Sequence, residues 1–75
     1  MARYKNLGGN SGVVEYEIGE DSIRVAFDDG WKYLYTYQSA GSHHIEQMKQ
    51  LALYGQGLNS YIKKYVEKKY ARKFR

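Results

Sequence analysis

Three short segments with alternating apolar and polar residues constrain the fold of this chain more than any other feature. They are "VVEYEI" (13–18), "SIRVAF" (22–27) and "WKYLYTY" (31–37), and the short loops "GEDS" and "DDG" join them. Alternation with period two sends successive side chains to opposite faces of a strand, and loops this short join antiparallel neighbours. The sequence therefore predicts a three-stranded antiparallel β-meander.

The first hairpin has an apolar face and a charged face. Val14, Tyr16 and Ile18 alternate with glutamates, so we expect these three side chains on the inner face. A four-residue loop pairs Ile18 with Ile23 and pairs Tyr16 with the residue opposite it, Val25.

The second turn decides whether a row of tyrosines belongs to the core or to the surface. A two-residue turn would pair Phe27 with Lys32 and expose the tyrosines. A three-residue loop with a left-handed glycine pairs Phe27 with Trp31 and places Tyr33 and Tyr35 on the inner face. We favour the second register, because a chain of 75 residues can hardly leave so many rings outside.

Two helices are expected after the meander. Ser42 can cap a helix that runs to about Leu53, with Glu46 near its first turn. The second helix starts near Asn59, leaves the body of the protein after Val66 and projects its last turns, "KKYARKFR", into solvent. The predicted fold is thus α+β: a three-stranded antiparallel β-meander followed by two α-helices packed on one face. Residues 1–12 are predicted to be a flexible arm, and residues 13–75 a single domain.

Charge is distributed unevenly along the chain. Residues 1–57 carry five basic and seven acidic side chains, whereas residues 58–75 carry seven basic side chains and only Glu67 as an acid. An anionic partner should therefore meet the C-terminal end. The chain has no cysteine and no apolar run of membrane-spanning length, so we expect a cytoplasmic protein with no membrane partner.

The order of these features resembles the KTSC domain family, named for the C-terminal extension of some lysyl-tRNA synthetases. The resemblance spans residues 11–70 and rests on the strand at 23–27, a turn glycine, a Tyr-x-Tyr pair and the later "GQGLNSYI". The matching residues are Ile23, Val25, Phe27, Gly30, Tyr33, Tyr35, Gly55, Leu58, Asn59 and Ile62. The family often has an apolar residue and a proline after Tyr-x-Tyr, whereas this chain has "TYQSAG" and no proline. The resemblance implies an α+β domain with an RNA-binding role and no established catalytic residues.

A row of basic residues on the second helix is the main candidate site. The predicted nucleic-acid-binding residues are Lys63, Lys64, Lys68, Arg72, Lys73 and Arg75. On a helix, Lys64, Lys68 and Arg72 would form one row that tracks a phosphate backbone without base specificity. The alternative is a solvated basic face that serves solubility. Likewise, Tyr33 and Tyr35 are either core residues, which we favour, or a platform for stacking bases.

Other constellations point to weaker sites. Gly57, Asn59 and Ser60 lie at a glycine-containing turn before a helix, which could hold an anion weakly or simply separate two helices. His43 and His44 are adjacent and would diverge on a helix, so we expect no metal site. We also expect no cofactor and no enzymatic activity, because no nucleophile with an oriented base is apparent.

We expect the function to be nucleic-acid binding, with RNA favoured over DNA. The alternative is a protein-interaction module that uses a sheet edge or exposed aromatic residues, with homodimerisation as one form of it. The sequence sets no oligomeric state.

Overall fold

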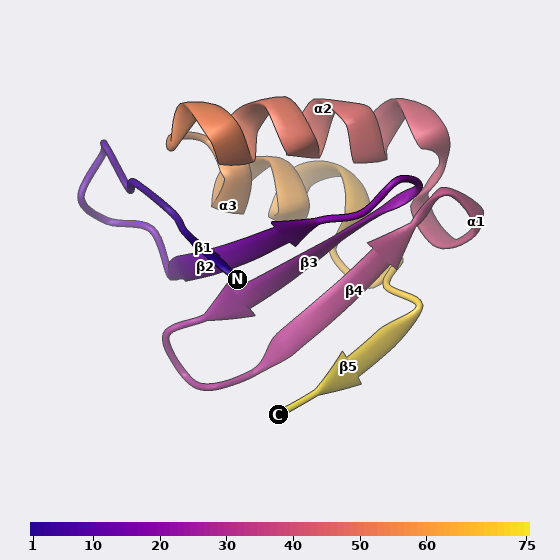
Figure 1. Cartoon of the computed structure of the whole chain (residues 1–75), viewed down its shortest axis with the longest axis horizontal. Helices are drawn as coiled ribbons and strands as arrows, with labels where there is room; N and C mark the ends of the chain where they lie inside the picture. Colours follow the sequence, from indigo (N-terminus) through magenta and orange to yellow (C-terminus); the bar gives the residue numbers. More distant parts are fainter.

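The structure, a computed structural model, describes residues 1–75 and contains one five-stranded antiparallel sheet with helices on one face (Figure 1). The strands follow in sequence order across the sheet: β1 (Ala2–Arg3), β2 (Val13–Ile18), β3 (Ser22–Phe27), β4 (Lys32–Thr36) and β5 (Arg72–Phe74). Between β4 and β5 lie α1 (Tyr37–Ala40), α2 (Ser42–Tyr54), α3 (Leu58–Tyr61) and the π-helical η1 (Ile62–Val66). The α+β class is confirmed, but the prediction of three strands and two helices omitted β1, β5 and α1.

The central meander has the predicted register. Ile18 pairs with Ile23 and Tyr16 with Val25, and across the next hairpin Val25 pairs with Tyr33. The backbone N–H of Phe27 donates to the carbonyl of Trp31 at 2.9 Å, and Gly30 has a φ of 91°. The loop "DDG" therefore forms the three-residue turn with a left-handed glycine, and this turn sets the face on which the tyrosines lie.

A β-bulge in β2 changes which valine is buried. The register shifts between Val13 and Glu15, so that Val13 pairs with Phe27 and is buried, while Val14 is exposed. The prediction that Val14 lies on the inner face was wrong, because the extra residue of a bulge reverses the alternation on one side of it. Ile18 is also exposed, and Tyr16 packs against the core.

The first twelve residues, predicted as a flexible arm, lie against the body of the protein in the structure. β1 extends the sheet beside β2, and Tyr4 is buried in the core. The Tyr4 hydroxyl accepts a hydrogen bond from the N–H of Leu58 at 3.3 Å, and the N–H of Leu7 donates to the carbonyl of Gly55 at 2.7 Å. This segment is thus joined to the turn that precedes α3.

The C-terminal segment differs most from expectation. The helix was predicted to leave the body of the protein after Val66 and to continue through "KKYARKFR". In the structure the helical region ends at Val66, and the chain then turns back and adds β5 to the sheet beside β4. The N–H of Ala71 donates to the carbonyl of Leu34 at 2.7 Å, just before the paired residues of β5. The prediction of a basic helix end that projects into solvent was therefore wrong. The edge of β4 offers unpaired backbone N–H and C=O groups, and the returning chain forms hydrogen bonds with them.

The segment "TYQSAG" forms the short helix α1 before α2 begins. Thr36 caps α1, because its side chain accepts from the N–H of Ser39 at 3.1 Å while the Ser39 hydroxyl accepts from the N–H of Thr36 at 3.0 Å. α2 occupies the predicted range, but Gly41 is its N-cap residue and Ser42 makes no capping hydrogen bond. The prediction of Ser42 as the cap was wrong, since the preceding helix already brings the chain to Gly41.

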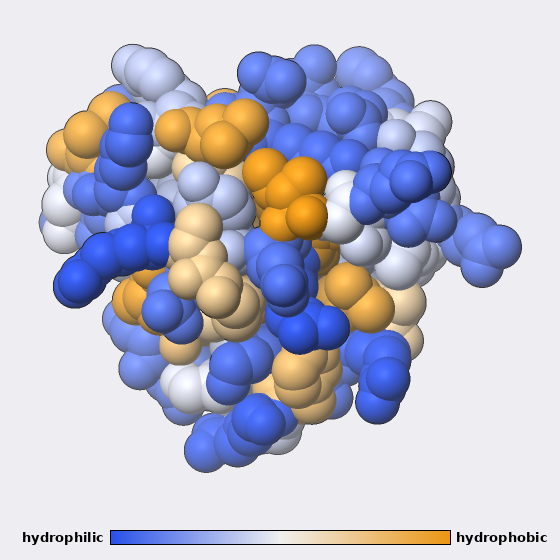
Figure 2. All heavy atoms as spheres, viewed as in Figure 1, coloured by the Kyte–Doolittle hydropathy of each residue, from blue (hydrophilic) through white to orange (hydrophobic).

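One apolar core lies between the sheet and the helices. Its buried residues come from every layer: Tyr4, Val13, Ile23, Val25, Tyr35, Ile45, Met48, Ala52, Leu58, Ile62 and Val66. The opposite sheet face carries Glu17, Arg24 and Lys32. Seen from the side shown in Figure 1, the surface is largely hydrophilic, and small groups of apolar residues lie among the hydrophilic ones (Figure 2). No helix of this fold is both long and apolar enough to cross a membrane.

Candidate nucleic-acid interface

Tyr35 belongs to the core, and its hydroxyl reaches the end of the helical region. The side chain is 1% exposed, and its hydroxyl donates to the carbonyl of Glu67 at 3.3 Å. Burial, followed by the proximity of Tyr33, Tyr70 and Glu67, raises the pKa of Tyr35 well above its ordinary value. This tyrosine therefore stays protonated and serves as a structural donor.

Tyr33 is half-buried and belongs to an aromatic cluster. Its ring meets Phe27 edge-on with centroids 5.4 Å apart and meets Tyr70 in the same manner at 5.1 Å. The Tyr33 and Tyr35 rings lie nearly parallel, with centroids 6.4 Å apart. Tyr70 comes from the loop before β5, so the return of the C-terminal segment completes the cluster.

A groove of about 350 Å³ runs between this aromatic cluster and the helical layer. Phe27, Tyr33, Tyr35 and Tyr70 form its aromatic wall, and Ile62 lies on the helical side. Three lysines line it as well: Lys63 from η1, Lys68 from the loop that follows and Lys73 from β5. We call this site the tyrosine–lysine groove.

Lysine and arginine side chains lie over the rings at one end of the tyrosine–lysine groove. The Lys73 ammonium is 4.5 Å from the centroid of Trp31 and 5.6 Å from that of Tyr33, and the Arg75 guanidinium carbon is 4.4 Å from the centroid of Trp31. These are cation–π distances. Because β5 pairs with β4, Lys73 and Arg75 lie directly over aromatic faces. The predicted helix could not produce this arrangement.

The predicted helical row of Lys64, Lys68 and Arg72 does not form, and the six predicted nucleic-acid-binding residues are distributed differently. Lys63, Lys68 and Lys73 meet at the tyrosine–lysine groove, and Arg75 lies next to it over Trp31. Lys64 instead approaches the ring of Tyr65 at 5.4 Å, and Arg72 pairs with Leu34 in the sheet. The helical row was wrong because the chain leaves the helix after Val66.

Two carboxylates also line the tyrosine–lysine groove. Asp29 comes from the turn before β4, and Glu67 is the residue that follows η1. Neither forms an ion pair with a lysine. With three lysines against two carboxylates, the lining keeps a small positive excess. Each lysine attracts phosphate and each carboxylate repels it.

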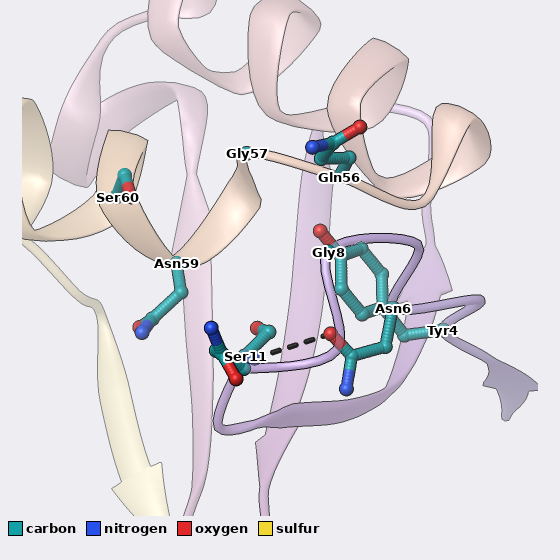
Figure 3. Close-up of a pocket in the computed structure, with 9 residues that line it drawn as sticks. Tyr4, Asn6, Gly8, Ser11, Gln56, Gly57, Asn59 and Ser60 are labelled. Atoms are coloured by element: carbon teal, nitrogen blue, oxygen red, sulfur yellow. Dashed lines mark hydrogen bonds between the residues drawn. The ribbon is translucent and has the colours of Figure 1, made fainter.

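The three predicted anion-binding residues lie together in a second hollow, of about 270 Å³. Gly57, Asn59 and Ser60 line it from one side, and residues of the "NLGGNSG" segment line it from the other (Figure 3). Its lining side chains are uncharged: Tyr4, Asn6, Asn10, Ser11, Gln56, Asn59 and Ser60, with two glycines. We call it the amide pocket. Sequence reasoning missed its N-terminal half, although a run rich in asparagine and glycine was visible there.

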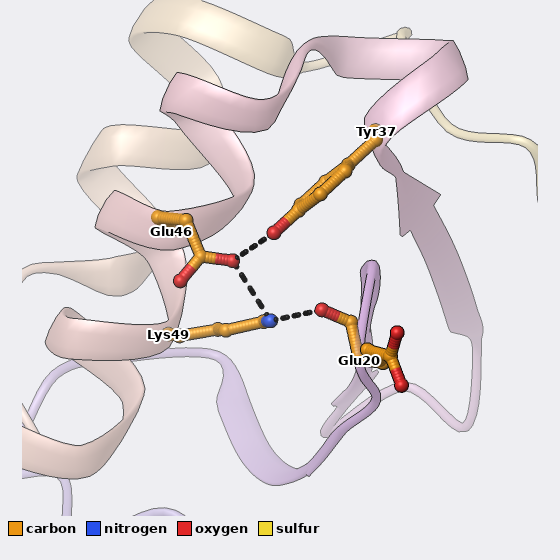
Figure 4. A network of polar contacts seen from close by, with 4 residues as sticks. All are labelled: Glu20, Tyr37, Glu46 and Lys49. Carbon is orange, nitrogen blue, oxygen red and sulfur yellow. Dashed lines mark hydrogen bonds and ion pairs between the residues drawn. The ribbon is translucent and has the colours of Figure 1, made fainter.

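A polar network fixes α1 and α2 to the first hairpin (Figure 4). Glu46 accepts hydrogen bonds from the Tyr37 hydroxyl at 2.6 Å and from the Lys49 ammonium at 2.9 Å. Lys49 also donates to the carbonyl of Glu20 at 2.8 Å. The hydrogen bond from Tyr37, and then that from Lys49, lowers the pKa of Glu46, and the same bond to Glu46 raises the pKa of Tyr37. This network holds elements together and lies outside both hollows.

The sheet edges are short. The outermost strands are β1 with two residues and β5 with three, so each edge offers few backbone groups to a partner strand.

His44 contacts two tyrosines of the helical layer. Its Nδ1 lies 2.7 Å from the Tyr61 hydroxyl, and its ring stacks on the ring of Tyr65. No group of three or more His, Asp or Glu side chains could hold a metal ion.

Protein-family models, curated proteins and solved structures give no match to this chain. The resemblance to KTSC domains therefore stays a prediction, as do the expected absence of enzymatic activity and the protein-interaction alternative.

Proposed function

We propose that this protein binds single-stranded nucleic acid, RNA in the first place, through the tyrosine–lysine groove. The observation that carries the proposal is the meeting of Lys63, Lys68 and Lys73 around half-buried aromatic rings. Single-stranded nucleic acid is bound by cationic grooves that follow the backbone and by aromatic side chains on which bases stack. The resemblance to KTSC domains points to the same class of ligand.

The aromatic and cationic groups would bind different parts of the nucleic acid. Phosphates would contact the three lysines, and a base would stack on Trp31 or Tyr70, both of which keep part of their surface exposed. Lys73 and Arg75 lie over the Trp31 ring without a ligand and can move aside toward phosphates, because lysine and arginine side chains are long and flexible. Tyr35 is the buried part of the aromatic wall.

The first prediction concerns salt dependence. We expect labelled RNA of about twelve nucleotides to bind with a log–log salt slope of about −2, since three phosphate contacts each contribute about −0.7 in single strands. Affinity should then fall about 20-fold between about 50 and about 200 mM salt. Fluorescence anisotropy measures both quantities. A flat response to salt would contradict the proposal.

Matched triple variants separate the groove from net charge. Lys63→Gln/Lys68→Gln/Lys73→Gln should remove most of the affinity and of the salt slope. Lys5→Gln/Lys32→Gln/Lys64→Gln lowers net charge equally, but none of its residues lines the groove, so it should bind almost as the unchanged protein does. Equal losses in the two variants would mean that only net charge attracts RNA, and the site would be wrong.

A further inference from the structure

The amide pocket opens beside the tyrosine–lysine groove, and one residue belongs to both. Asn59 lines the groove and the amide pocket alike, so the two hollows meet at α3. We propose that the amide pocket receives one nucleobase of the strand bound in the groove and reads its hydrogen-bonding edge. This inference rests on the proposed function, since it names how that same interface would select a sequence.

The chemistry of the lining fits a base and not a phosphate. No cationic side chain lines the amide pocket, so it lacks the positive charge that dominates affinity for phosphates. A primary amide both donates and accepts, and this pairing is the one that asparagine and glutamine use on base edges. Unpaired bases in single strands expose these edges for recognition.

Several polar groups of the amide pocket are free to bind a ligand. The side chains of Asn10, Gln56, Asn59 and Ser60 make no hydrogen bond within the chain. Two other side-chain oxygens are engaged: the Asn6 Oδ1 accepts from the backbone N–H of Ser11 at 3.1 Å, and the Ser11 hydroxyl accepts from the N–H of Val13 at 3.1 Å. Figure 3 shows the first of these bonds on the side of the pocket opposite Gln56 and Ser60. The pocket thus combines a fixed wall with unpaired amides.

Contacts between distant parts of the chain preform the amide pocket. The buried ring of Tyr4 forms a wall, and its hydroxyl holds the N–H of Leu58. The hydrogen bond from Leu7 to Gly55 joins the N-terminal segment to the loop before α3. Its volume of about 270 Å³ is small for a ligand pocket, which suits one planar base.

The test uses uncharged ribonucleosides, which lack the phosphates that the groove would bind. We expect one of adenosine, cytidine, guanosine and uridine to shift the backbone amide NMR signals of residues 6–11 and 56–60 at millimolar concentration. The variant Gln56→Ala/Ser60→Ala should abolish these shifts, and it should fold normally because both residues are exposed. The control Gln47→Ala/Gln50→Ala removes two exposed side chains that do not line either hollow and should change nothing.

A second readout distinguishes failure of this inference from failure of the proposed function. With RNA homopolymers, the amide-pocket variant should lose about tenfold in affinity for the preferred base and little for the others. RNA binding that is equal for all bases, with no nucleoside shifts, would overturn base reading and leave the groove intact. Absence of RNA binding together with a selective nucleoside shift would overturn the proposed function while supporting the amide pocket as a base site. Equal shifts by all four nucleosides would overturn base selection.

Discussion

Tyr35 joins the sheet to the end of the helical region through one buried ring and one hydroxyl. We expect Tyr35→Phe to lower the free energy of unfolding by about 1 kcal/mol, because it leaves the Glu67 carbonyl without this donor. Tyr35→Ala should lower the free energy of unfolding by about 3–5 kcal/mol, since it also leaves a cavity in the core where the residue is only 1% exposed. Urea denaturation measures both values.

The exposed Tyr54 provides the control for this comparison. Its ring is 62% exposed, so Tyr54→Phe should change the unfolding free energy by less than about 0.5 kcal/mol. A Tyr35→Ala protein as stable as the unchanged chain would contradict the placement of this ring, and with it the register of β4.

Glu46 makes the free energy of unfolding depend on pH in the acidic range. Its pKa is lowered below the ordinary value of 4.5, so the charged form is favoured in the folded state. The resulting stabilisation is present above pH 4.5 and is lost as pH falls through the lower, folded-state pKa. We expect Glu46→Gln to lose less stability on acidification, measured as the urea midpoint at neutral and acidic pH.

Tyr37→Phe tests the cause of that shift. It removes the hydrogen bond that contributes most to lowering the pKa of Glu46 and leaves the Lys49 contact in place. Its acid dependence should fall between that of the unchanged protein and that of Glu46→Gln. Identical acid profiles for all three proteins would show that this network has no part in the response.

At the scale of the element, the second turn fixes the face of β4. Gly30 has a φ of 91°, and a Cβ there would meet no atom within 4 Å, so its constraint is conformational and not steric. Gly30→Ala should therefore lower the unfolding free energy by about 1 kcal/mol, and Gly30→Asn by less, because asparagine tolerates this region better.

Gly12→Ala is a matched control for the turn. Gly12 lacks a positive φ, and a Cβ there would have its nearest contact at an ordinary 3.6 Å. Its stability should stay close to that of the unchanged protein in the same urea titration. Equal losses at the two glycines would argue against a conformational origin for the effect at Gly30.

The C-terminal strand shows where local pattern fails at this scale. Apolar spacing through Val66 matched a helix, and Lys69 marked the end of the apolar stripe, but the basic residues that follow carry no signal for a strand. β5 exists because β4 presents an edge to which residues 72–74 can bond. Its three residues alone would not form a stable strand.

For the whole molecule, tertiary structure rearranges the charges that the sequence concentrates at one end. Lys63, Lys68 and Lys73 are spread over eleven positions of sequence, 63–73, on three successive segments, yet they line one groove. The amide pocket likewise joins residues 6–11 to residues 56–60. The sequence grouped Asn59 and Ser60 as neighbours in a predicted anion site, and both line this pocket, but it had no means of pairing them with the N-terminal segment.

The sequence by itself determined the meander, its register and the side of the sheet on which the tyrosines lie, together with the range of α2. Those features depend on alternation, loop length and helical spacing, all of which act between residues close in the chain. Only the tertiary structure decided the bulge that buries Val13, the docking of residues 1–12 and the return of the C-terminal segment as β5. Each of these depends on backbone groups and apolar surface that distant segments present, and both hollows arise where those segments meet.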